Sequence, residues 1–206
     1  GSEFDSSDYN LHLGSATITH ADLASYCDDE NDISAISSSG QILGYGGKFY
    51  VNCPNKEKTL IFSAAGVKID EQNNGKVGLT ANASCNGNKV VAANEPTRTN
   101  YNTNASAFYK YNGYTISDQQ CSGGNLYYYT YDADTNGLYK NGTLIGDGVY
   151  AYALINGKAY WVNSRENIQC EDGTIIAKPK GGYHVSSVIN NNGKIGLVVY
   201  KSNKNW

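Results

Sequence analysis

Four aspartates could supply the charged groups of a binding site. Asp32 and Asp147 come just before apolar runs that are expected to form strands, and Asp70 and Asp118 follow such runs. Carboxylates that converge can bind a cation or the hydroxyl groups of a sugar, and a pair of them can act as the acid and the base of a glycosidase. Because aspartate is also a common turn residue, the four are candidate ligand-binding residues only if the fold gathers them.

A possible calcium loop lies in the second half of the chain. The segment Asp132-Ala-Asp134-Thr-Asn136-Gly matches the first half of a calcium-binding loop, D-x-D-x-N-G. The position at which an EF-hand carries its bidentate glutamate is Thr143 here, so backbone oxygens would have to complete the site. Asp132, Asp134 and Asn136 are therefore the candidate metal ligands, with calcium as the only cofactor expected. The alternative is an exposed turn.

Aromatic side chains form the third candidate set, because sugars stack on exposed rings. Tyr129, Tyr131 and Trp161 are the rings that we assign to a ligand site. Packing between strands is the alternative for most of the set, because aromatic residues contribute strongly to protein cores. The full set is Phe108, Tyr109, Tyr111, Tyr127, Tyr129, Tyr131, Tyr150, Tyr152 and Trp161.

Other kinds of site and partner are disfavoured by the sequence. No glycine-rich phosphate loop, nucleophile elbow or H-E-x-x-H motif occurs, and the three histidines, His12, His20 and His184, are not expected to form a metal site. The net charge of −3 argues against nucleic acid as a partner. The longest apolar runs are too short to cross a bilayer, so membrane insertion is not expected.

Two local features also carry predictions. Thr19-His-Ala-Asp22 resembles a helix capping box and predicts about one helical turn. Of the five cysteines, Cys85 and Cys121 fall at similar places in consecutive units, where a disulfide between them is conceivable. Residues 1–4 have the sequence of a cloning remnant, so the domain is taken as residues 5–206.

The elements that would position these residues follow a repeat. Residues 123–147 and 156–178 each open with a turn signal, Gly123-Gly124 or Asn156-Gly157, followed by an apolar and aromatic run and a polar loop. A second turn signal then precedes another apolar run, at Asn141-Gly142 in the first copy. Glycine and asparagine tolerate the positive φ that such hairpin turns need. Each unit therefore predicts two linked hairpins, that is, a four-stranded antiparallel meander.

The first turn of the unit recurs along the chain every 33 to 40 residues. The fifth unit shows only its first two strands, and the strand-turn-strand pattern of residues 9–19 matches the missing half. Between residues 70 and 120 two frames are open, since Asn74-Gly75 fits the first turn as well as Asn86-Gly87 does. The predicted units are residues 33–70, 71–118, 119–146 and 147–178, with the last formed by 179–206 together with 8–20.

A ring of repeats has no open edge when both termini contribute to one unit. We therefore predict an all-β, five-bladed β-propeller with four-stranded antiparallel blades, closed by both termini. A β-sandwich or jelly roll is the alternative. The predicted arrangement resembles the five-bladed tachylectin-like lectins. The resemblance concerns the blades alone and implies carbohydrate binding without naming any binding residue.

These features favour a secreted or cell-surface recognition module without enzymatic activity. The chain is rich in tyrosine, with 18 residues, and in asparagine, as are many recognition surfaces. The expected partner is a glycan or a glycoprotein surface. The alternatives are a protein–protein interaction scaffold and a glycoside-acting enzyme. The enzyme would use the four aspartates named above, which in a propeller would gather round one mouth of the central channel.

Overall fold

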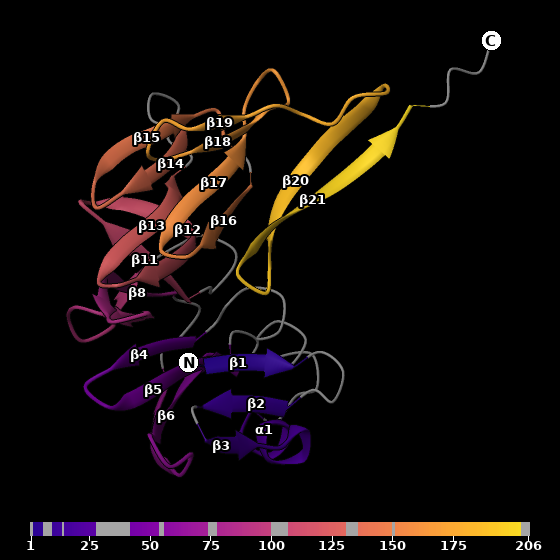
Figure 1. Cartoon of the computed structure of the whole chain (residues 1–206). Coiled ribbons are helices and arrows are strands. Elements are labelled where there is room, and N and C mark those ends of the chain that lie inside the picture. The colour runs from indigo at the N-terminus through magenta and orange to yellow at the C-terminus, as the bar shows by residue number, and fades with distance from the viewer. Residues whose placement is uncertain are drawn as a thin grey trace.

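The computed structural model describes residues 2–5, 10–13, 15–27, 42–53, 56–73, 78–99, 107–130, 136–149 and 151–202. Within these residues the chain forms strands and one short helix, and all strand pairs but one are antiparallel. Figure 1 shows a succession of small sheets in sequence order, from the N-terminal sheet at the bottom to the C-terminal hairpin at the right. The predicted all-β class is confirmed.

Three of the predicted four-stranded meanders are present. One comprises β4 (Ile42–Tyr45), β5 (Lys48–Cys53), β6 (Lys58–Ser63) and β7 (Lys68–Asn73). A second runs through β12 (Tyr114–Ser122), β13 (Asn125–Thr130), β14 (Gly137–Lys140) and β15 (Thr143–Asp147). The third comprises β16 (Tyr152–Ile155), β17 (Lys158–Val162), β18 (Ile168–Cys170) and β19 (Ile175–Ile176).

The predicted two-residue turns connect these strands. Both residues have positive φ at Asn141-Gly142 (48° and 87°) and at Asn156-Gly157 (50° and 78°), as primed hairpin turns require. First turns of different units also touch. The Gly124 N–H donates to the Gly87 carbonyl at 3.0 Å, and the Asn156 side-chain amide donates to the Gly193 carbonyl at 3.0 Å. These contacts stack the repeated units on one another.

The second unit departs from the predicted meander. β8 (Gly78–Asn86) pairs in antiparallel fashion with β9 (Lys89–Ala92) and β10 (Thr97–Thr99), but in parallel with β11 (Ala107–Tyr111). β11 then forms a hairpin with β12, so the second and third units share one eight-stranded sheet. The boundary predicted between residues 118 and 119 lies inside the single strand β12 and is wrong. No turn signal encodes a parallel pair, because its strands need a longer connection.

Apolar side chains on both faces of the middle strands join consecutive sheets. On β13, Leu126 and Tyr128 belong to a core shared with β4, β5, β6, β8, β9, β11 and β12, whereas Tyr127 and Tyr129 belong to a core shared with β17. These side chains alternate because successive residues of a strand point to opposite faces. Burial on both faces agrees with the prediction that these strands are sandwiched between sheets.

The N-terminal ribbon packs on the first meander. It consists of β2 (Asn10–Leu13), β3 (Ala16–Ile18) and α1 (His20–Cys27), and its apolar side chains share a core with β5 and β6. The predicted cap begins α1, since the Thr19 hydroxyl accepts a hydrogen bond from the Asp22 N–H at 3.2 Å. The core residues are Leu11, Leu13, Ile18, Leu23, Cys27, Val51, Cys53, Leu60 and Phe62.

Two disulfides join elements that are distant in sequence. Cys85–Cys121 links β8 to β12, which confirms the pairing considered from the sequence, and Cys27–Cys53 links α1 to β5. Cys170 is buried as a free thiol. No helix within the described ranges is long and apolar enough to cross a membrane.

The predicted pairing of the chain ends is absent from the described strands. β2 pairs with β3 and with β1 (Ser2–Asp5), while β20 (Tyr183–Asn191) and β21 (Lys194–Lys201) form a separate two-stranded sheet. The described sheets therefore do not close into a ring. The edge of β2 pairs with β1, most of which belongs to the predicted cloning remnant, and the sequence analysis did not predict this pair.

Candidate functional site

A pocket of about 410 Å³ opens between the third and fourth sheets in chain order, which are the eight-stranded sheet that contains β12 to β15 and the sheet of β16 to β19. Its volume falls within the range of small-molecule sites, roughly 300 to 1,000 Å³. The lining residues come from β12, from β13 and from the start of β16, so two neighbouring sheets build it together. They are Asp118, Gln119, Gln120, Tyr129, Ala151 and Tyr152.

An irregularity in β12 turns the polar side chains toward this pocket. The pairing of β12 with β13 shifts register between Ser117 and Gln120, so Asp118 and Gln119 lie in a β-bulge. Asp118 has a φ of 49°, which is uncommon for a residue other than glycine. Bulges re-aim side chains and are frequent beside functional sites. Asp118 is exposed at this bulge and Gln119 is half-buried.

Two tyrosines form the aromatic side of the pocket. The Tyr152 hydroxyl donates to the Asp118 carbonyl oxygen at 2.5 Å and so ties the fourth sheet to the bulge. The rings of Tyr152 and Tyr129 meet edge to face, with their centroids 5.2 Å apart. Burial, with smaller contributions from Tyr129 and Asp118, raises the pKa of Tyr152 well above its ordinary value. Tyr152 therefore stays protonated and acts as a donor at neutral pH.

This combination of groups suits a ligand that carries many hydroxyl groups. The Asp118 carboxylate accepts hydrogen bonds, and the side-chain amides of Gln119 and Gln120 can both donate and accept them. The half-buried ring of Tyr152 adds apolar contact area on the same side. Among the described lining residues Asp118 is the only acid.

Two of the other three predicted aspartates, Asp70 and Asp147, lie on outer strands. Asp70 is exposed on β7, and its carboxylate accepts a hydrogen bond from the Glu71 N–H at 2.8 Å. Asp147 is the last residue of β15, pairs with Gly137 and is exposed. Neither lines the pocket with Asp118. Asp32 lies outside the described residues, so the gathering of the four carboxylates stays a prediction.

The calcium loop is described only in part. Asp132 and Asp134 lie outside the described residues, while Asn136 is exposed and its carbonyl accepts a hydrogen bond from the Gly148 N–H at 3.4 Å. Within the described part of the chain, no three His, Cys, Asp or Glu side chains are grouped so that they could hold a metal ion. Calcium binding therefore stays a prediction.

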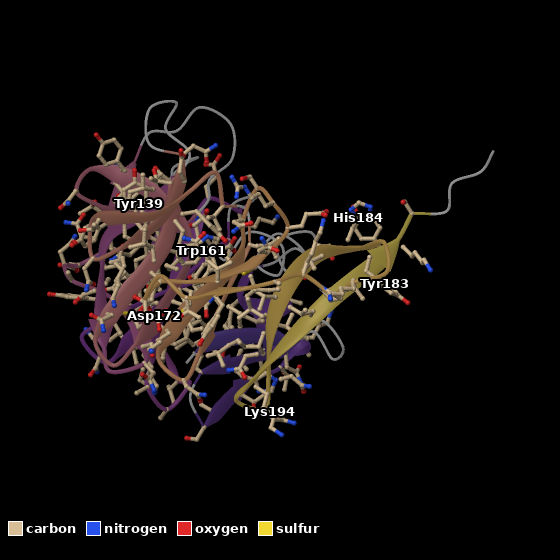
Figure 2. The ribbon with its side chains drawn as sticks, turned by 45° about the horizontal axis from the view of Figure 1, so that its top comes forward. Tyr139, Trp161, Asp172, Tyr183, His184 and Lys194 are labelled. Atoms are coloured by element: carbon tan, nitrogen blue, oxygen red, sulfur yellow. A yellow bond between two sulfur atoms is a disulfide. The ribbon has the colours of Figure 1, made fainter. Side chains whose placement is uncertain are left out.

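The predicted aromatic residues have different positions. Tyr129 lines the pocket although only 2% of it is exposed. Trp161 is 3% exposed and packs in the core between the third and fourth sheets, and Figure 2 places it in the body of the molecule among other side chains. Tyr131 lies outside the described residues. Of the three rings, Tyr129 alone is seen to line this pocket.

Sequence reasoning missed Gln119, Gln120 and Ala151 as lining residues and treated Tyr152 only as one of many aromatics. The signal was present in residues 117–120, where Ser-Asp-Gln-Gln interrupts a strand with four polar residues in succession. A bulge re-aims the side chains of a strand, so this polar stretch could have been considered as one.

Comparisons with known proteins give no family. No protein-family model matches the sequence, and no curated protein matches it. Among solved structures, the crystal structure of glutaminyl cyclase from Myxococcus xanthus is similar over 77% of this chain and 84% of that one, with 13% identity. The TM-score of that match is 0.24, and at this value the likeness carries no argument about fold or activity.

Proposed function

We propose that this chain is a recognition module that binds a carbohydrate, without catalysing a reaction, in the pocket between its third and fourth sheets. The observation that carries the proposal is the convergence of Asp118, Gln119 and Gln120 with the rings of Tyr129 and Tyr152. Sugars present hydroxyl groups at their edges and apolar faces above and below the ring. A carboxylate and two amides beside aromatic surface match both properties.

Binding is favoured over hydrolysis by the number of acids. Glycoside hydrolysis requires in most families two carboxyl groups on either side of the scissile bond, and the described lining of the pocket contributes only Asp118. A secreted or cell-surface location fits the two disulfides, since such bonds persist in oxidising compartments. Calcium at Asp132, Asp134 and Asn136 is a separate proposal that the pocket does not require.

We also propose that the five units are blades of one propeller. The contacts between their first turns and the burial of the middle strands on both faces support this arrangement. The pocket then lies between two neighbouring blades. Comparable positions between other blades would allow several weak sites to act together, which raises avidity for a surface with many glycans.

A glycan array with matched variants tests the proposed function. We expect the protein to bind a subset of glycans and Asp118→Asn to weaken that binding about tenfold or more, because hydrogen bonds to a charged group contribute about 1.5–3 kcal/mol. Asp70→Asn is the control, since Asp70 is an equally charged and exposed residue on β7. The array is run with calcium and with a chelator, and unchanged binding is expected.

Three outcomes would contradict the proposal. Equal loss of binding in the two variants would mean that Asp118 has no specific role. An array without binding, together with capture of a defined protein, would favour the interaction scaffold. Release of sugar from any glycan, abolished by Asp118→Asn, would favour the enzyme.

A further inference from the structure

The pocket that Asp118 lines carries negative charge without a cation to balance it. Asp118 is its one acid, and lysine, arginine and histidine are absent from its described lining residues. No ion pair in the described part of the chain includes Asp118. Its charge acts on the pocket, because it adds to the larger effects of burial and Tyr129 that raise the pKa of Tyr152. The pocket is therefore a region of negative potential.

Two other acids lie where elements from different parts of the chain meet, and both are paired. Glu171, between the third and fourth sheets, lies 2.8 Å from the Lys140 ammonium group. Glu166, in the connection from β17 to β18, lies 3.1 Å from the Lys178 ammonium group. Asp118 lies at a boundary as well, because its pocket is lined from two sheets. A bound ligand would supply the cation that is missing there.

The polar groups of the pocket also offer more hydrogen-bond acceptors than donors. The Asp118 carboxylate only accepts hydrogen bonds. The Tyr152 hydroxyl has a single hydrogen, which it donates to the Asp118 carbonyl oxygen at 2.5 Å, so this hydrogen is not available to a ligand. The side-chain amides of Gln119 and Gln120 supply donors and acceptors alike. The lining therefore matches a ligand group that donates hydrogen bonds.

We propose that the ligand of this pocket is a basic sugar, that is, a sugar with a free and protonated amine, and that the Asp118 carboxylate binds its ammonium group. This inference rests on the proposed carbohydrate binding and names the class of sugar. An ammonium group carries three donors and no acceptor, so it supplies both the charge and the hydrogen bonds that the lining lacks. The amides of Gln119 and Gln120 then bind hydroxyl groups of the same ligand.

Other sugars fit the charge of the pocket less well. A neutral sugar that covers Asp118 removes water from the carboxylate and puts no cation in its place, and burial of an unpaired charge is costly. An ammonium group offsets that cost by its attraction to the carboxylate, which is stronger where water is excluded. Sugars that carry a carboxylate or sulfate group are repelled by Asp118. The expected order of affinity is therefore basic, then neutral, then acidic sugars.

Titration calorimetry with three oligosaccharides of equal length and linkage tests the proposal. They are built from glucosamine, from glucose and from N-acetylglucosamine, so they differ only in an ammonium, a hydroxyl or an acetamido group on each ring. We expect the glucosamine oligomer to bind about tenfold or more tightly than the other two, because a hydrogen bond between two charged groups contributes more than a neutral one. Added salt should reduce this difference, because it screens the ion pair.

Asp118→Asn tests the residue that carries the inference. Asn and Asp both tolerate positive φ, so the backbone of the bulge, with its φ of 49° at this position, suits either residue. We expect the preference for the glucosamine oligomer to disappear in this variant. Asp147→Asn is the control, because Asp147 is exposed on β15 and does not line the pocket. This variant should keep the preference.

Four outcomes would overturn the inference. Equal or tighter binding of a neutral oligomer, still weakened by Asp118→Asn, would do so and leave the carbohydrate site in place. No binding of the glucosamine oligomer would do so too, and the glycan array then decides separately on the proposed function. A preference for glucosamine that survives Asp118→Asn would assign the amine to another part of the protein. Displacement of the glucosamine oligomer by an equal concentration of spermidine, a cation without hydroxyl groups, would show that the pocket recognises charge alone.

Discussion

Glu171 joins the third and fourth sheets, and its removal should destabilise the protein measurably. Glu171 directly follows β18, and its side chain is 11% exposed. One carboxylate oxygen accepts hydrogen bonds from the Tyr127 hydroxyl at 2.6 Å and the Ala159 N–H at 2.9 Å. The other lies 2.8 Å from the Lys140 ammonium group. Tyr127 and Lys140 belong to one sheet and Ala159 to the next, so the contacts cross the boundary between them.

Glu171→Ala leaves a buried hydroxyl and a buried N–H without their acceptor. Each such loss costs about 1–3 kcal/mol, and partial access of water should hold the total near 3 kcal/mol. For a protein of this size about 3 kcal/mol corresponds to roughly 6–12 °C in Tm. Glu171→Gln is the matched control, because it keeps an oxygen acceptor and loses the charge beside Lys140. We expect Glu171→Gln to lower the free energy of unfolding by less, about 1 kcal/mol.

The penalty should also depend on pH. Burial opposes ionisation of Glu171, but the hydrogen bonds from Lys140, Tyr127 and Ala159 outweigh it and hold its pKa below the ordinary value. The stabilisation is therefore present above the unfolded pKa, about 4.3, and is lost as the pH falls through the folded pKa. Chemical denaturation from pH 7 to pH 3 should show the difference between the native chain and Glu171→Ala narrowing. If Glu171→Ala lowered the free energy of unfolding by less than about 0.5 kcal/mol at pH 7, which is the usual range for surface substitutions, this account of the contact would be refuted.

Three further predictions concern single elements. Cys85→Ser opens the loop that the disulfide with Cys121 closes, and it should lower the free energy of unfolding by about 4 kcal/mol through loop entropy. An equal Tm of the native chain with and without reductant would contradict this. Asn141→Ala removes the acceptor of the Leu126 N–H and places alanine at positive φ. Urea denaturation should therefore show a free energy of unfolding lower by about 1–2 kcal/mol. An unchanged midpoint of denaturation would contradict this role of the turn. Tyr152→Phe removes the hydrogen bond to the bulge and should weaken glycan binding several-fold by titration calorimetry, whereas unchanged affinity would separate the bulge from the site.

Local signals in the sequence predicted the local parts of the fold. Asn-Gly and Gly-Gly pairs marked the turns, because few residues tolerate the backbone angles that such turns impose. Thr19 and Asp22 marked the start of α1, because an unpaired N–H near a helix start needs an acceptor such as the Thr19 hydroxyl. Runs of apolar residues on both faces, as in β13, indicated strands between two sheets.

Contacts between distant segments were beyond these signals. Two pairings depend on which segments meet in space: the parallel pair of β8 with β11 and the pair of β1 with β2. No turn motif in the sequence predicts either pair. The candidate site shows the same limit. Asp118 and Tyr129 were named from the sequence, but only the pairing of β12 with β13 brings them to one pocket, and Tyr152 comes from the next sheet.

The most direct test of the account is a titration of the isotopically labelled protein with a glycan, followed by ¹H–¹⁵N NMR. If the pocket is the binding site, the amide signals of Gln119, Gln120 and Ala151 should shift with a single saturable dependence on glycan concentration. The same titration of Asp118→Asn should need a concentration about tenfold higher. Saturable shifts that leave these three signals unmoved, or no shift with any glycan, would contradict it.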